Sequence, residues 1–205
     1  MATTNSILRS RLRVDLDEPA ADRWSDDDLD RHIQHAIRDI NRVVPREMKA
    51  TGLTIADPAS RELDVSSLTD LIHVVAVEYP VGLYPRRLRH FETWGSTLSL
   101  LTETMPAAGA GVCVYYTTQH TVDSEGSTLP AYLEDVALVG AAGYAMLDYL
   151  AANENRVTIG GDRTVEQLHV FANDRLMQFR QDLTALKHER RQAIRTGELW
   201  TEDER

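Results

Sequence analysis

Apolar residues recur at helical spacing in the first part of the chain. Between residues 25 and 45 they are three or four positions apart, which places them along one face of a helix. These positions are Leu29, Ile33, Ile37, Ile40 and Val44. We expect this helix to start at Ser25 and to end at Pro45, because a proline ring disfavours helical geometry in the preceding residue. A shorter helix is expected over residues 5–13.

The pattern changes to that of strands between residues 48 and 118. Short runs rich in Val, Ile, Leu, Thr and aromatic residues alternate with turn formers such as Asp57-Pro58. Gly95-Ser96, between HFETW and TLSLL, predicts a two-residue hairpin loop. This stretch therefore predicts a small antiparallel sheet or sandwich of about five or six strands.

Helical spacing returns after Leu129-Pro130. The run AYLEDVALVGAAGYAMLDYLAA is apolar nearly all round, which is typical of a buried central helix. Its small residues at 140–143 would let neighbouring backbones approach closely. Apolar positions from Val165 to Leu186 predict a long last helix, with Thr164 as its N-cap and Gln167 at the capping-box position.

The order of elements predicts a mainly α fold with a β insertion, of the α+β class. We expect a bundle of about three to four helices that carries an antiparallel β-sheet or sandwich. The predicted parts are N-terminal helices over residues 1–47, the β insertion over 48–122, two long helices over 128–196, and a charged tail over 197–205.

Composition narrows the class of protein. A hydrophobic share of 42% and a charged share of 26% are usual for a soluble globular chain of 205 residues. Glu134, Asp135 and Asp148 argue against a membrane helix, and the N-terminus lacks a signal-peptide pattern. A single cysteine, Cys113, excludes an intramolecular disulfide and suits a reducing compartment. The formal net charge of −10 argues against a general nucleic-acid binder.

The run Asp26-Asp27-Asp28 has two interpretations. Ser25 with Asp28 resembles a capping box, and carboxylates in a first helical turn are stabilised by the helix dipole. The alternative is a metal site, because spacings of four, three and four place four possible ligands near one helix face. Those residues are Asp28, His32, His35 and Asp39. No HExxH motif accompanies them, so we favour the capped helix and expect no metal.

Catalytic motifs are missing from the sequence. There is no GxSxG, Cys113 lies inside a predicted strand, and Gly109-Ala110-Gly111 matches no phosphate-binding loop. We therefore expect no enzyme activity and no cofactor. Six aromatic residues of the β region could form a carbohydrate or peptide surface, but we favour a role in the core, since aromatics suit strands. They are Tyr79, Tyr84, Phe91, Trp94, Tyr115 and Tyr116.

Several segments together resemble the head–tail adaptor (connector) proteins of tailed double-stranded DNA bacteriophages. RWSDDDLDRHIQHAIRDINRVVP resembles their opening helix. VVAVEYPVGLYPRRLRHFETWGSTLSLLT and MPAAGAGVCVYYTTQHTV resemble a β insertion found in one branch, and STLPAYLEDVALVGAAGYAMLDYL resembles their central helix. The resemblance covers most of residues 20–190. Small helical members lack so large an insertion, so the family does not explain residues 50–120.

The resemblance implies a structural virion protein of the neck, assembled in the host cytoplasm. Such adaptors form a ring, commonly of about twelve chains, in which closed symmetry stabilises many weak contacts. The ring joins the portal protein to a downstream tail or stopper protein and extends the channel for DNA ejection, with genomic DNA passing through unbound. A C-terminal segment often docks on the portal; here that implies Leu199 and Trp200.

The sequence leaves two alternative functions open. One is a β-sandwich module on a helical base that binds a protein or a glycan. The other, weaker alternative is a metal-dependent hydrolase built on the Asp/His helix.

Overall fold

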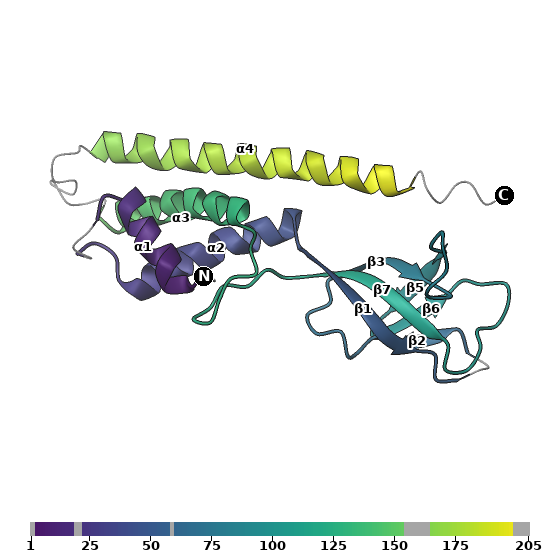
Figure 1. Cartoon of the computed structure of the whole chain (residues 1–205). Coiled ribbons are helices and arrows are strands. Elements are labelled where there is room, and N and C mark those ends of the chain that lie inside the picture. Colours follow the sequence, from purple (N-terminus) through teal and green to yellow (C-terminus); the bar gives the residue numbers. More distant parts are fainter. Residues whose placement is uncertain (1–2, 19–21, 58–59, 154–164, 199–205) are drawn as a thin grey trace. The chain divides into compact units, whose positions relative to one another are not determined.

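The structure is a computed structural model that describes residues 3–18, 22–57, 60–153 and 165–198, with side chains up to residue 191. Within these residues it has four helices and seven antiparallel strands, which confirms the predicted α+β class (Figure 1). The chain forms two compact units. Of the described residues, the helical unit contains those up to Val44 and those from His120 to Glu198, and the β unit contains Pro45–Gln119.

Two short segments of sequence form the first half of the helical unit. Helix α1 (Asn5–Asp15) buries Leu8 and Leu12. Helix α2 (Asp26–Val43) starts after Ser25 and ends before Pro45, as predicted. Its apolar face, expected from the three-and-four spacing, is buried at Leu29, Ile33, Ala36, Ile37 and Ile40.

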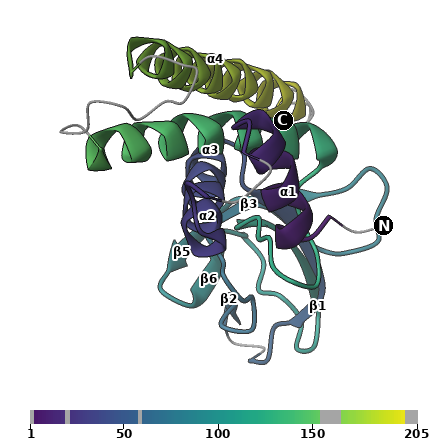
Figure 2. The same ribbon diagram turned by 90° about the vertical axis from the view of Figure 1, so that its left-hand side faces the viewer.

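Helix α3 (Ala131–Ala152) is the centre of the helical unit. It lies between helix α4 (Val165–Glu198) on one side and α1 with α2 on the other, as both views show (Figures 1 and 2). By length and composition α3 could also cross a membrane. In the structure, however, eleven of its residues are buried, which confirms the predicted central helix.

Two glycines of α3 let α4 approach closely. A Cβ on Gly143 would lie 2.7 Å from Leu176 Cγ and 3.2 Å from the Leu176 backbone nitrogen. A Cβ on Gly140 would lie 3.0 Å from the ring of Phe179. Leu176 and Phe179 of α4 occupy the space that side chains at positions 143 and 140 would need. The predicted close approach at these small residues is therefore confirmed.

The β unit consists of two antiparallel sheets. The larger sheet has the order β1 (Arg46–Thr54), β7 (Gly111–Thr118), β3 (His73–Glu78) and β4 (Leu88–Arg89). Strand β7, the last in the sequence, thus pairs with β1 and β3, both much earlier in the chain.

The smaller sheet has the order β2 (Glu62–Asp64), β6 (Thr97–Leu100) and β5 (Phe91–Trp94). Strands β5 and β6 form the predicted hairpin, in which Trp94 pairs with Thr97 and the loop is Gly95-Ser96. Gly95 has a φ of 59°, a conformation that glycine adopts readily. One apolar core contains residues of both sheets, namely Ile55, Leu63, Val65, Val77, Leu98, Leu100, Val112, Val114 and Tyr116.

The chain leaves and re-enters the helical unit at neighbouring points. The Asn41 side-chain amide donates a hydrogen bond to the His120 carbonyl oxygen (3.1 Å), and the His120 N–H donates one to Asn41 Oδ1 (2.8 Å). Just beyond them, Arg46 of β1 pairs with Thr118 of β7. The two ends of the β unit are thus held side by side.

Candidate interaction surfaces

The acidic start of α2 is held by contacts within the helical unit. The Asp28 N–H donates to Ser25 Oγ (3.1 Å), and the Ser25 N–H donates to Asp28 Oδ2 (3.3 Å). Hydrogen bonding from Ser25 keeps the pKa of Asp28 below its usual value. A hydrogen bond from Arg13 (2.8 Å) likewise lowers the pKa of Asp26. The predicted capping box is confirmed, with aspartate in place of the more usual Glu or Gln.

His32, one of the four residues considered as metal ligands, is buried beside α3. Its side chain faces Asp148, with 3.5 Å between His32 Nε2 and Asp148 Oδ2. Only 5% of His32 is exposed, and burial lowers the pKa of the imidazole, with Arg31 nearby adding to the shift. Asp28, one turn earlier, is engaged with Ser25 instead.

His35 and Asp39, the other two candidates, contact a tyrosine of α3. The His35 ring stacks on Tyr144, with 4.1 Å between ring centroids. Tyr144 Oη donates to Asp39 Oδ2 (2.7 Å), and burial together with this hydrogen bond raises the pKa of Tyr144 to about 12. Among the described residues no three His, Cys, Asp or Glu side chains are grouped so that they could hold a metal ion.

A second buried polar contact lies in the β unit. Glu78, which is 4% exposed, accepts hydrogen bonds from Tyr115 Oη (2.9 Å) and from the Gly82 N–H (3.4 Å). Burial, followed by the bond to Glu78, raises the pKa of Tyr115 to about 12. Cys113 is fully buried in β7, which confirms its predicted place in the interior. The two hydrogen bonds to Glu78 connect β3 with β7 and with the loop that follows β3.

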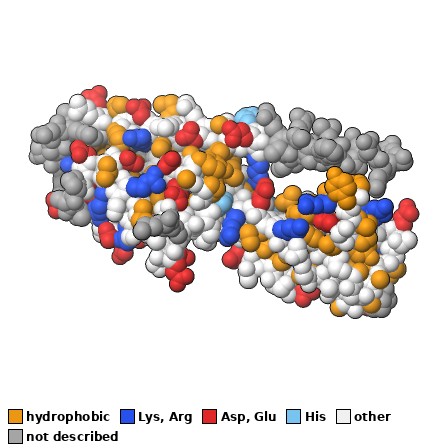
Figure 3. Space-filling view, viewed as in Figure 1, with side chains coloured by type: hydrophobic (Ala, Val, Ile, Leu, Met, Phe, Trp, Pro, Cys, Tyr) orange, Lys and Arg blue, Asp and Glu red, His pale blue; other side chains and the backbone are white. Residues whose placement is uncertain are grey.

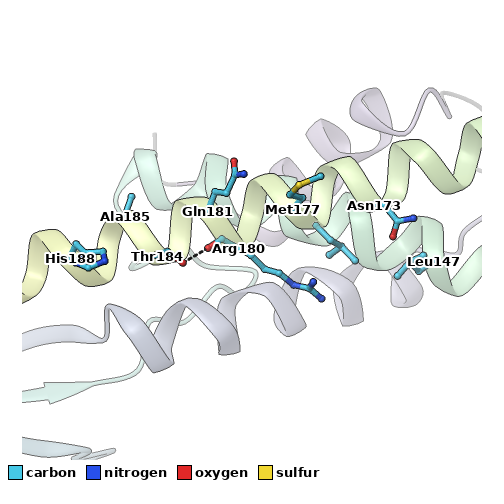
Figure 4. A pocket seen from close by; sticks show the side chains of 9 residues that line it. Leu147, Asn173, Met177, Arg180, Gln181, Thr184, Ala185 and His188 are labelled. Atoms are coloured by element: carbon cyan, nitrogen blue, oxygen red, sulfur yellow. Dashed lines mark hydrogen bonds between the residues drawn. The ribbon is translucent and has the colours of Figure 1, made fainter.

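The first candidate surface is a groove along α4, which we call the α groove. Its volume is about 760 Å³. Figure 4 shows its lining side chains, which come from one stretch of α4 and from Leu147 of α3. Met177 is 53% exposed there, and Arg180 is the charged residue that extends from α4. The full lining is Leu147, Asn173, Leu176, Met177, Arg180, Gln181, Thr184, Ala185 and His188.

The second candidate surface is a groove of about 640 Å³ on the β unit, which we call the β groove. Residues of β1, β3 and β7 form its floor, and the segment 84–88 before and within β4 forms a wall. The lining is mainly apolar and aromatic, with one acidic and one basic residue. It consists of Glu47, Met48, Val75, Ala76, Tyr84, Pro85, Arg86, Leu88, Tyr115 and Tyr116.

Exposed apolar side chains surround the β groove. We define the β3–β4 surface as the exposed residues Val75, Val81, Leu83, Tyr84, Arg86, Arg87 and Leu88. Tyr84 is 100% exposed, and neither Arg86 nor Arg87 forms an ion pair or side-chain hydrogen bond with another described residue. Lys and Arg side chains lie beside hydrophobic ones on the β unit in Figure 3. Such a mixture is typical of a surface that binds a partner.

The six aromatic residues that are expected in the core differ in their exposure to solvent. Tyr116 is buried, and Tyr79, Phe91 and Tyr115 are half-buried, as expected. The expectation is wrong for Tyr84 and for Trp94, which is 90% exposed. Tyr84 lies in a loop and Trp94 at a hairpin end, where the alternation of a strand no longer decides which way a side chain points.

The predicted partner-binding residues Leu199 and Trp200 lie outside the described residues, as does the predicted N-cap Thr164. Sequence reasoning also missed the β3–β4 surface as a site. The signal that could have found it is the run VGLYPRRL, in which apolar residues precede Pro85 and two arginines follow it, instead of apolar and polar residues alternating as in a strand.

No family of known proteins and no curated protein matches the chain. Among solved structures, a chain from the neck of an empty gene transfer agent particle, computed with C6 symmetry, is 15% identical, with a TM-score of 0.30. That likeness covers 82% of this chain and 88% of the other. A chain from the virion of the native gene transfer agent particle is 16% identical, with a TM-score of 0.29, over 82% and 87%. Because TM-scores this low do not establish a common fold, we base the function on the chain's own residues.

Proposed function

We propose that the protein is a non-enzymatic structural subunit of a phage-like neck, a head–tail connector that assembles into a ring. The observation that carries the proposal is the β3–β4 surface, where Tyr84, Leu83 and Leu88 are exposed beside Arg86 and Arg87. A lone chain gains nothing from leaving these side chains in water. A subunit that buries them against a neighbour gains the hydrophobic free energy on assembly.

The chemistry of the buried polar groups supports a structural role. Asp28 caps a helix, Asp39 accepts the Tyr144 hydroxyl, and Glu78 accepts the Tyr115 hydroxyl. Asp28 thus stabilises the start of α2, and Asp39 and Glu78 each hold two elements together. The acidic balance of the chain, −10, suits a channel that DNA must leave without being bound.

The proposed partners follow from the family resemblance. The ring contains about twelve copies, joins a portal protein to a downstream tail or stopper protein, and lets genomic DNA pass. Leu199 and Trp200 are the residues that we assign to contact with a neighbouring protein, since exposed tryptophan is a frequent interface anchor.

Mass measurement of the purified chain over a range of concentrations tests the proposal. We expect a closed ring of defined mass, formed by the chain alone or when a portal protein is added. A chain that stays monomeric under both conditions would contradict ring assembly.

The β groove favours a second candidate, a β-sandwich module that binds a glycan or a protein. Its apolar floor and its aromatic side chains Tyr84 and Tyr115 are suited to such ligands. Calorimetric titration with a panel of glycans separates the candidates: a strictly monomeric chain that binds a sugar supports the module and not the connector.

A further inference from the structure

The β groove has the chemistry of a receptor for an acidic segment with an apolar anchor. Arg86 lines the groove and Arg87 follows it, both exposed and neither paired with another described residue. Met48 of β1, Val75 of β3 and Leu88 of β4 line the same groove and give it an apolar surface. A partner that places an aromatic side chain on this floor and carboxylates against the arginines would complement both features.

Glu47 is the acidic residue of the lining, and it restricts how a ligand can lie. It belongs to β1, whereas Arg86 belongs to the segment before β4, with β7 and β3 between these strands. An acidic ligand is therefore attracted to the Arg86 side of the groove and repelled from the Glu47 side. This asymmetry favours one direction of binding for an extended segment.

The chain's own sequence contains a segment of this kind. Residues 198–204 read ELWTEDE, in which Leu199 and Trp200 stand among four carboxylates. The large apolar pair suits the floor of the groove, and the acidic residues suit Arg86 and Arg87. The segment follows directly after the described part of α4, which ends at Glu198.

We propose that the C-terminal tail of one copy binds the β groove of a second copy. Trp200 and Leu199 pack on the apolar floor, and the carboxylates after Trp200 face Arg86 and Arg87. The choice of a second copy rests on the proposed function, because a tail-to-groove contact joins unlike surfaces and so repeats around a ring. The neighbouring protein assigned to the tail is then the next subunit and not the portal.

Peptide binding tests the contact directly. The probe is a fluorescein-labelled peptide of residues 196–205, and the receptor is the full chain with Leu199→Ala and Trp200→Ala, so that its own tail does not compete. We expect saturable binding in fluorescence anisotropy. Arg86→Glu in the receptor should weaken it about tenfold or more, as should Trp200→Ala in the peptide.

The matched control is Arg38→Glu, which reverses an exposed arginine of α2 that has no ion pair with another described residue. It should leave peptide affinity within about twofold of the unsubstituted receptor, because it makes the same change of charge at a residue that does not line the groove. Circular dichroism of each variant establishes that it is folded. No saturable binding, or equal weakening by Arg38→Glu and Arg86→Glu, would overturn the inference.

Complementation distinguishes a second copy from the same chain. One variant carries Arg86→Glu and keeps its tail; the other carries Leu199→Ala with Trp200→Ala and keeps its groove. Each alone should have lost self-association through this contact, whereas the mixture should form heterodimers, because one intact tail meets one intact groove. Absence of heterodimers despite peptide binding would overturn the role of the second copy.

Ring formation separates this inference from the proposed function. If both variants still form the wild-type ring, the tail contact is wrong while the connector proposal stands. If the wild-type chain forms no ring with or without a portal protein, the connector proposal fails, although peptide binding can still establish the groove as a receptor.

Discussion

The helical unit and the β unit use their charged side chains in different ways. In the helical unit, Arg9, Arg11 and Arg13 of α1 form ion pairs with carboxylates of the segment before α2, of α2 and of α3. In the β unit, Arg86 and Arg87 remain unpaired with other described residues and stand beside exposed apolar side chains. The three arginines of α1 thus bind within their own unit, whereas Arg86 and Arg87 are presented to solvent. Stability and recognition should therefore respond to mutation in separate places.

Trp24 and Trp94, one from each unit, provide the strongest test of this separation. Trp24 is 4% exposed and its indole N–H donates to the Ala145 carbonyl oxygen (3.2 Å), whereas Trp94 is 90% exposed. Trp24→Ala should lower the free energy of unfolding by about 3–5 kcal/mol, because it removes a buried aromatic side chain. Trp94→Ala should lower it by less than about 0.5 kcal/mol. Urea denaturation of both variants measures this, and equal losses would break the comparison.

Two arginines test the same contrast for charge. Arg13 donates to Glu18 (2.8 Å), whose carboxylate is 4% exposed, and to the Trp24 carbonyl oxygen (3.1 Å). Arg13→Ala should cost about 1.5–3 kcal/mol of stability, since it removes charge-assisted hydrogen bonds from a buried carboxylate. Arg86→Ala should leave the urea midpoint unchanged. A large loss of stability in Arg86→Ala would show that this residue belongs to the fold of the β unit.

A pair of glycines gives a smaller effect. Gly143→Ala places a Cβ against Leu176, and the resulting overpacking should exceed the gain in helix propensity, for a net loss of about 1 kcal/mol. Gly52→Ala in β1 meets no atom within 4 Å and serves as the control. The shift in melting temperature measures both, and a stabilised Gly143→Ala variant would contradict the close approach of α3 and α4.

The smallest expected effect is a change in how the melting temperature depends on pH. Burial lowers the pKa of His32 in the folded chain, so the unfolded chain takes up a proton first as the pH falls below about 6.5. The contribution of His32 to stability is present above that pH and decreases below it. His32→Gln should therefore show a smaller drop in melting temperature between pH 7.5 and 5.5 than the wild type. An equal drop in both chains would contradict the assignment of this pH dependence to His32.

Much of the helical unit could be predicted from the sequence because its determinants are local. The Ser25–Asp28 cap and Pro45 act within one turn of the ends of α2, and the nearly continuous apolar run of α3 predicts its burial by itself. The spacing of four residues between Asp28 and His32 also correctly predicts that both lie on one face of α2. What the spacing did not include was α3, in which Asp148 faces His32 and Tyr144 contacts both His35 and Asp39, while Asp28 is held by Ser25.

The β unit was less predictable because its pairing is non-local. Strand β7 takes its place between β1 and β3 only through hydrogen bonds to residues about forty and sixty positions earlier in the chain. The β3–β4 surface depends on a loop, where neither the period of a strand nor that of a helix sets the direction of a side chain. The preference of aromatic residues for strands therefore fails to predict the exposure of Tyr84 and Trp94.

The paired hydrogen bonds between Asn41 and His120 make the β unit a removable part. Its first and last strands already lie side by side at Arg46 and Thr118, so a short glycine-rich linker can replace residues 45–119 and close the gap. The shortened chain retains the complete set of helices and their shared core. A gene could therefore exchange this module for another of different specificity without redesigning the bundle that carries it.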